Sequence, residues 1–133
     1  MKNCIFCKII SREIPAKIID ENDKIIVFLD LKNHPLVLPK IHIENIYGLD
    51  DKIASEIMKS AVKISKAVKK GLNADGVNLI QNNEKAAGQE VMHFHMHIKP
   101  RFRSDSVMIH LPEEDSSEEK RRIILEKIKQ ALD

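Results

Sequence analysis

The sequence has no marked excess of either charge and no long hydrophobic run. Its 22 Lys and Arg residues nearly balance its 20 Asp and Glu residues, giving a formal net charge of +2. A dedicated nucleic-acid binder carries a strong basic excess, so nucleic acid is not an expected partner. The first 15 residues contain only short apolar runs broken by charged residues, which predicts neither a secretory signal nor a membrane span. We therefore expect a cytoplasmic protein without a membrane partner.

Cysteine is scarce as well, since the chain contains only Cys4 and Cys7. In a reducing compartment these are more typical of free thiols or metal ligands than of a structural disulfide. Linkers and internal repeats are also absent from the sequence, so its 133 residues predict one domain with a sizeable core. We expect residues 1–112 to form the body of that domain and residues 113–133 to form a charged C-terminal helix.

The most informative stretch is VMHFHMHIKPR, residues 91–101, in which His93, His95 and His97 alternate with apolar residues. Successive side chains of a β-strand point to opposite faces, so a strand here would present all three imidazoles on one face and the apolar residues to a core. A helix would scatter the imidazoles. Three interpretations follow: three zinc ligands of a metallohydrolase, an acid/base or nucleophilic cluster, or incidental histidines on an ordinary strand.

The rest of the chain predicts strands and helices of an α+β domain. KIID and KIIVFLD flank the turn ENDK and predict a β-hairpin, and PLVLPK and GVNLIQNN predict two further strands. Apolar residues recur at helical spacing over residues 51–70, with Asp50 or Asp51 as the N-cap and Gly71 at the end. A final helix is expected from about Ser117. We expect a mainly antiparallel sheet of about five strands, one long helix and a C-terminal helix.

The loop NNEKAAGQE precedes the histidines and is rich in small residues. Ala86, Ala87 and Gly88 allow close approach of the backbone to a ligand, as in loops that bind phosphate. Small residues also form ordinary turns, so this loop is more informative beside the histidines than alone.

These stretches resemble the histidine triad (HIT) family, whose signature is His-x-His-x-His followed by hydrophobic residues and stands here as HFHMHIK. The resemblance extends through CIFCKII, IVFLD, LVLPKIHIENI and NNEKAAGQEV. It implies a HIT-like fold, a homodimer, and hydrolysis or transfer on nucleotides with a substituted α-phosphate, such as nucleoside phosphoramidates or dinucleoside polyphosphates. The alternative is a zinc-stabilised regulatory protein that binds a purine nucleotide with little catalysis.

The resemblance assigns His95 as the nucleophile that attacks the α-phosphorus and forms a nucleotidyl-histidine. An imidazole is substantially neutral at pH 7, so it can attack without prior activation. His97 matches the third histidine of the triad, where a donor would stabilise charge on the phosphate oxygens.

The resemblance also implies nucleotide contacts. The expected phosphate contacts are Asn82, Gly88, Gln89 and Glu90, although strand alternation favours Gln89 over Glu90 on the histidine face. Asp30 and Leu31 match positions at the ribose. Phe6, Ile9 and Phe28 would form the wall of the base pocket, or would be ordinary core residues.

For the cysteines, the resemblance implies a zinc ion bound by Cys4, Cys7, His42 and His93. Two sulfur and two nitrogen ligands make a closed tetrahedral site, so this zinc would be structural. It would not take part in catalysis. Unligated cysteines or a redox pair are the alternatives. A zinc bound by all three triad histidines is disfavoured, because His93 has better partners in the cysteines and His42.

Two departures from the family pattern stand out. Between FLD and LVLPK the family usually has a longer loop, whereas this chain has LKNHP and lacks about four residues, which puts base and ribose recognition in doubt. Glu84 stands where the family commonly has glycine and would alter the loop turn. The remaining histidines, His34 and His110, are interpreted as ordinary loop residues.

Overall fold

The sheet is five-stranded and antiparallel throughout, in the order β1-β2-β3-β5-β4. The structure is a computed structural model that describes residues 3–109, 111, 114 and 116–132. Its strands are β1 (Lys17–Glu21), β2 (Ile25–Leu29), β3 (Pro35–Pro39), β4 (Gly76–Gln81) and β5 (Met96–Arg101). Its helices are α1 (Ile5–Ile10), α2 (Asp51–Gly71) and α3 (Glu118–Ala131), with short 3-10 helices η1 (Ile46–Gly48) and η2 (Lys85–Ala87). The α+β expectation is confirmed.

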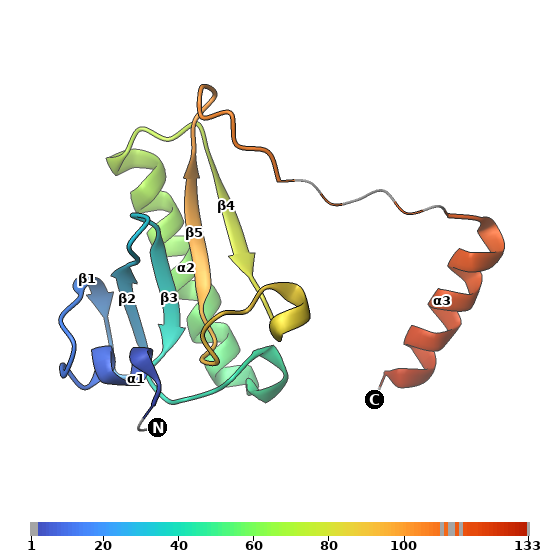
Figure 1. Ribbon diagram of the computed structural model, residues 1–133, viewed down its shortest axis with the longest axis horizontal. Helices are drawn as coiled ribbons and strands as arrows, with labels where there is room; N and C mark the ends of the chain where they lie inside the picture. Colours follow the sequence, from blue (N-terminus) through green and yellow to red (C-terminus); the bar gives the residue numbers. More distant parts are fainter. Residues whose placement is uncertain (1–2, 110, 112–113, 115, 133) are drawn as a thin grey trace.

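Helix α2 covers one face of the sheet along its length (Figure 1). Asp50 caps its start, with its side chain accepting a hydrogen bond from the N–H of Ile53 at 2.8 Å. The helix buries one apolar face against the sheet, and this core also includes Phe94 and Ile98 from the histidine-bearing segment. The apolar side of that segment therefore faces α2, as its alternation predicts, and the imidazoles face away from α2.

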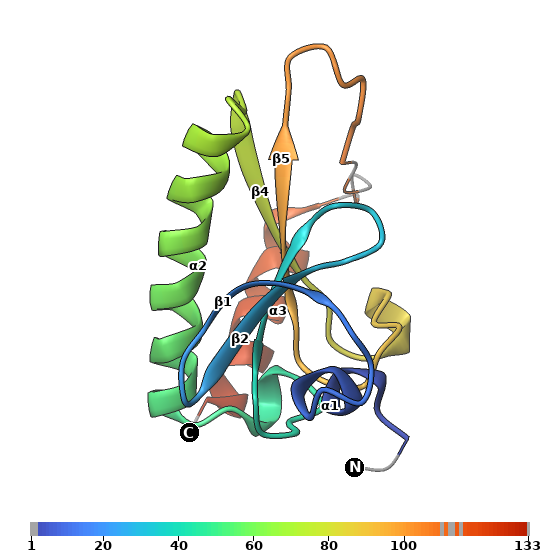
Figure 2. The same cartoon turned by 90° about the vertical axis from the view of Figure 1, so that its left-hand side faces the viewer.

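The short helix α1 packs on the other face of the sheet (Figure 2). Its buried residues Phe6 and Ile9 form a second core cluster with residues of β2 and β3, among them Phe28. The side chain of Cys4 accepts a hydrogen bond from the N–H of Cys7 at the start of this helix. Helix α1, which the sequence pattern does not predict, lies on the same side of the sheet as the imidazoles.

The histidine strand is shorter than predicted, because β5 begins at Met96 and not near residue 91. The residues before it leave the regular ladder: the N–H of Phe94 donates to the carbonyl of Ile43 at 2.6 Å, and the His93 ring bonds the Pro39 carbonyl. Within β5, Met96 pairs with Val37 on one side and Gln81 on the other. The alternation of side chains nevertheless persists through the irregular part.

Helix α3 begins after Ser117, as predicted, with the Ser117 hydroxyl accepting a hydrogen bond from the N–H of Lys120. Helix α3 lies apart from the sheet (Figure 1), and it has no buried residue among those described. In the described part of the chain, no helix is both long enough and apolar enough to cross a membrane.

Candidate functional site

The triad histidines lie in a row on the face of the sheet that carries α1. The His93 side chain is fully buried, His95 is 9% exposed, and His97 is half-buried. The ring of His95 packs edge-on against Phe6, with 5.0 Å between ring centroids, and lies 5.1 Å from the ring of His97. Helix α1 therefore covers the middle histidine and excludes water from one side of it.

The tautomer of His95 is fixed by a backbone contact. Its Nδ1 lies 2.7 Å from the carbonyl oxygen of His93. A carbonyl oxygen only accepts hydrogen bonds, so Nδ1 carries the hydrogen and Nε2 keeps an unprotonated lone pair. Burial lowers the pKa of His95, opposed by the bond to the His93 carbonyl. The ring is thus held neutral with one nucleophilic nitrogen.

His97 faces a carboxylate on the end of β2. Its Nδ1 lies 3.6 Å from Asp30 Oδ2, and the same oxygen lies 3.8 Å from Nδ1 of His34. Burial lowers the pKa of both imidazoles, while Asp30 opposes the shift. The structure places His34, interpreted above as an ordinary loop residue, on the loop after β2 and close to Asp30 and His97. His110 lies outside the described residues.

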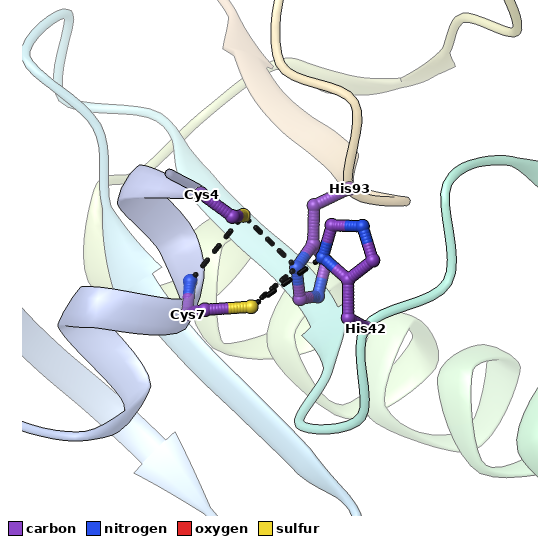
Figure 3. Close-up of side chains that lie close together, drawn as sticks. All are labelled: Cys4, Cys7, His42 and His93. Atoms are coloured by element: carbon purple, nitrogen blue, oxygen red, sulfur yellow. Dashed lines mark hydrogen bonds between the residues drawn. The ribbon is translucent and has the colours of Figure 1, made fainter. Parts of the chain in front are cut away.

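At the His93 end of the row, side chains from three segments distant in the sequence meet (Figure 3): Cys4, Cys7, His42 and His93. Cys4 Sγ lies 3.5 Å and Cys7 Sγ 3.6 Å from His93 Nδ1, and Cys7 Sγ lies 3.4 Å from His42 Nδ1. A tetrahedral zinc ion with ordinary bond lengths separates its sulfur and nitrogen ligands by about 3.6 Å. The donor set and its spacing therefore fit a metal ion.

A hydrogen bond to the backbone fixes the tautomer of His93 that can bind a metal ion. Its Nε2 lies 2.8 Å from the carbonyl oxygen of Pro39, so Nε2 carries the hydrogen and Nδ1 presents its lone pair to the thiols. Burial lowers the pKa of His93 to about 4, which keeps the ring neutral at physiological pH. Neutral imidazole is the form that binds metal. This cluster is able to hold a metal ion.

The expected phosphate loop is a compact turn around η2. The N–H of Gly88 donates to the Lys85 carbonyl and the N–H of Gln89 to the Glu84 carbonyl, so the turn itself uses both groups. The buried Gln89 side chain bonds the carbonyls of Glu44 and Val91 and the N–H of Glu84. The side chain of Gln89 therefore stabilises the loop through these hydrogen bonds. Its contact with a phosphate stays a prediction.

The other two predicted phosphate residues differ in exposure. Asn82 is half-buried, and its amide donates to the Gly88 carbonyl at 3.5 Å. Gly88 has a φ of 89°, and an added Cβ would lie 3.5 Å from that amide. Glu90 is exposed, and its charge acts to raise the pKa of His95 against the larger effect of burial. Their contacts with a phosphate stay predictions.

The five residues predicted to contact the base and ribose lie in two different places in the structure. Phe6, Ile9 and Phe28 are buried in one core cluster, and of these Phe6 contacts the ring of His95. Leu31 is fully exposed on the loop after β2, next to the half-buried Asp30. Their roles toward a base and ribose stay predictions.

A model of the HIT domain matches residues 11–104. This chain belongs to the HIT family. It is 43% identical over 105 residues to Protein hit of Bacillus subtilis, covering 76% of this chain and 72% of that protein. It is also 37% identical over 110 residues to the adenosine 5'-monophosphoramidase HNT1 of Saccharomyces cerevisiae, covering 80% of this chain and 67% of the yeast protein.

Solved structures of HIT proteins share the fold. The crystal structure of SMU.412c from Streptococcus mutans superposes with a TM-score of 0.93 at 35% identity, covering 100% of this chain and 87% of that one. A Zn-bound histidine triad family protein from Mycobacterium smegmatis superposes with a TM-score of 0.76 at 31% identity, covering 98% and 99% of the two chains. The HIT-like fold expected from the sequence is confirmed.

Glu84 is strained in this HIT protein. Its φ of 70° and ψ of 163° fall in a region that is almost restricted to glycine and costs on the order of 1–3 kcal/mol for other residues. This backbone conformation favours glycine, the residue that the family commonly has at the position of Glu84.

Replacing Glu84 with glycine should remove this strain and raise the free energy of unfolding by about 1 kcal/mol, after the entropic cost of glycine. Urea denaturation measures the change. The matched control is Lys85→Gly in the adjacent 3-10 helix, which should lower stability by roughly 0.5–1 kcal/mol. Equal destabilisation by both variants would contradict the strain at Glu84.

Proposed function

We propose that this protein is a nucleotide hydrolase or nucleotidyl transferase that cleaves α-phosphate-substituted nucleotides through an intermediate on His95. The observation that carries the proposal is the neutral, buried imidazole of His95, whose Nδ1–H donates to the His93 carbonyl at 2.7 Å and leaves Nε2 to attack. Membership of the HIT family supports the substrate class, because one relative is an adenosine 5'-monophosphoramidase.

The chemistry divides into two displacements at phosphorus. Nε2 of His95 bonds to the α-phosphorus, and the bond to the leaving nitrogen or oxygen breaks; the leaving group takes the electron pair of that bond and a proton from solvent water. A water molecule then attacks the phosphorus and loses a proton to solvent, and the bond to Nε2 breaks with its electron pair returning to Nε2, which releases a nucleoside monophosphate. His97 lies two residues after His95 on the same face of the strand. It would donate a hydrogen bond to the phosphate oxygens that gain negative charge.

Contacts to the nucleotide follow from the same arrangement. Asn82 and Gly88 would approach the phosphate, with Gln89 and Glu90 in the same loop. Asp30 would accept hydrogen bonds from ribose hydroxyls beside Leu31, and Phe6, next to the His95 ring, would contact the base together with Ile9 and Phe28. A purine nucleotide derivative, either a nucleoside phosphoramidate or a dinucleoside polyphosphate, is the proposed substrate.

Replacing His95 with asparagine should lower turnover of adenosine phosphoramidate by about four orders of magnitude or more, because no other group forms the intermediate. Replacing His97 should cost about 10²- to 10³-fold, the usual loss of one donor to a developing oxyanion. Steady-state assays on the phosphoramidate and on diadenosine polyphosphates, side by side, measure both effects and identify the preferred substrate.

Rapid quenching with substrate labelled on the α-phosphate should trap label on the wild-type protein as an acid-labile phosphoramidate, and none on His95→Asn. Both proteins should bind the nucleoside monophosphate product to a similar extent, which controls for folding. Nucleotide binding without turnover or label in the wild type would favour the alternative, a regulatory nucleotide-binding protein. Label on another residue would overturn the assignment of His95.

We also propose that the cluster at the start of α1 holds a structural zinc ion. Two thiolates and two imidazoles favour zinc over hard cations and close the tetrahedral site, leaving no position for substrate. The Zn-bound relative from M. smegmatis supports the choice of metal. Thiolate ligands require a compartment that keeps cysteine reduced, and we propose the cytoplasm.

Purified wild-type protein should contain about one zinc per chain, and Cys4→Ser and Cys7→Ser should each lose most of it and unfold at lower temperature, because binding energy is folding energy in such sites. Elemental analysis and thermal denaturation measure this. His42→Gln is the matching change on the nitrogen side. Zinc-free wild-type protein, or cysteine variants with unchanged thermal stability, would refute the assignment.

We propose that two copies of the chain form a homodimer. The family resemblance implies it, and the exposed apolar surface supports it. On helix α3, the exposed fractions of Ile123, Ile124 and Ile128 lie between 41% and 58%. On the edge strand β4, Leu79 is 45% exposed. A second copy could bury both surfaces without a change in fold.

Light scattering at micromolar concentration should give about 30 kDa, twice the 15.2 kDa of one chain. Ile128→Glu should shift the protein toward the monomer, because it places a charge on the apolar side of α3. The control Lys127→Glu introduces the same carboxylate at the next position and should leave the mass unchanged. A monomeric wild type, or equal dissociation by both variants, would contradict the arrangement.

A further inference from the structure

Asp30 is held rigidly by the loop that follows β2. Its Oδ1 accepts hydrogen bonds from the backbone N–H groups of Lys32 and His34, each at 2.8 Å. Its own N–H donates to the His34 carbonyl at 2.9 Å, and its carbonyl accepts from Asn33 at 3.1 Å. The first two bonds fix the carboxylate through Oδ1, and the other two fix the backbone of Asp30.

Two imidazole nitrogens face the other carboxylate oxygen of Asp30. His34 Nδ1 lies 3.8 Å and His97 Nδ1 lies 3.6 Å from Asp30 Oδ2. One ligand atom from each of the three side chains lies within 4.8 Å of those of the other two. All three residues are half-buried, and none of them belongs to the cysteine cluster.

We propose that Asp30, His34 and His97 bind a second divalent transition-metal ion. A tetrahedral ion with ordinary bonds to nitrogen and oxygen separates these ligands by about 3.4 Å. Each imidazole nitrogen would approach Asp30 Oδ2 by a few tenths of an ångström, and the two nitrogens, which lie within 4.8 Å of each other, would also move closer together. Two imidazoles and one carboxylate suit Zn²⁺, Co²⁺, Ni²⁺ or Fe²⁺ better than Mg²⁺ or Ca²⁺. Unlike the cysteine cluster, this set provides three ligands and keeps an open position.

A neighbouring lysine, Lys99, should weaken the binding of this metal ion. Lys99 follows His97 on the same face of β5, and its Nζ lies 3.5 Å from Nε2 of His34. An ammonium donates to Nε2, which places the ring hydrogen on Nδ1, the nitrogen that the ion needs. Its positive charge also repels a cation. Removing this ammonium should therefore strengthen metal binding.

The second ion would compete with the nucleotide. Asp30 and His97 are the side chains proposed above to contact ribose and phosphate, so an ion bound to both withdraws them from substrate. This consequence rests on the proposed function, whereas metal binding does not.

The test is a calorimetric titration of zinc-loaded protein with Co²⁺ in the absence of nucleotide, followed in parallel by visible absorption. Wild-type protein should bind one Co²⁺ per chain, with d–d bands but no thiolate-to-cobalt charge transfer, because the cysteine cluster already holds zinc. His34→Gln and Asp30→Asn should weaken binding by at least about tenfold, as expected for loss of a ligand. Lys99→Met should tighten it. Asp23→Asn, which removes an exposed carboxylate that is not one of the three ligands, is the matched control for Asp30→Asn and should bind as the wild type does.

Circular dichroism and zinc content establish that each variant folds before it is titrated. Absence of Co²⁺ binding in the wild type, equal affinity in Asp30→Asn and Asp23→Asn, or weaker or equal binding in Lys99→Met would each overturn the proposal. A protein that binds Co²⁺ at the second site but hydrolyses no nucleotide would refute the proposed function alone. Hydrolysis without Co²⁺ binding would refute the second site alone.

Discussion

The arrangement of this site depends on one buried residue, His93. Its Nδ1 faces the thiols of Cys4 and Cys7, its Nε2 donates to the Pro39 carbonyl, and its own carbonyl accepts from the ring of His95. An imidazole with no exposed surface would be costly if any of these groups lacked a partner. All of them are satisfied, so His93 joins the N-terminal helix, the end of β3 and the candidate nucleophile.

Because His93 connects these elements, the stability of helix α1 affects the position of His95. Helix α1 supplies both thiols of the cluster and also Phe6, whose ring packs against His95. Displacing α1 would therefore loosen the metal ligands, open the covered side of the imidazole and shift the carbonyl that fixes its tautomer. A structural metal ion at the cluster would thus act on turnover through the position of His95 and without contacting substrate.

Much of this site follows from periodicity in the sequence. The alternation from His93 to Ile98 predicts which side chains face the core and which face a ligand, and the structure retains that alternation even where β5 is irregular. Helical spacing and the Asp50 cap likewise predict α2 almost to the residue. These features depend on local geometry, which a sequence shows directly.

What the sequence did not reveal depends on contacts between distant segments. Helix α1 has only six residues, too few for a periodic signal, and its position is fixed by packing on β2 and β3. The start of β5 is delayed because Phe94 bonds Ile43, far away in the chain. His34 stands four residues after Asp30, a spacing that hints at a shared site only once the turn between them is known.

Two groups of potential ligands therefore flank His95, a closed one that ends at His93 and an open one that begins at His97. The central claim is that the first group fixes the reactive nitrogen of the imidazole between them. Long-range ¹H–¹⁵N NMR of protein labelled in its histidine rings tests this at neutral pH. The account predicts His95 protonated on Nδ1 alone and His93 protonated on Nε2 alone. A His95 ring that carries its hydrogen on Nε2, or on both nitrogens, would contradict it.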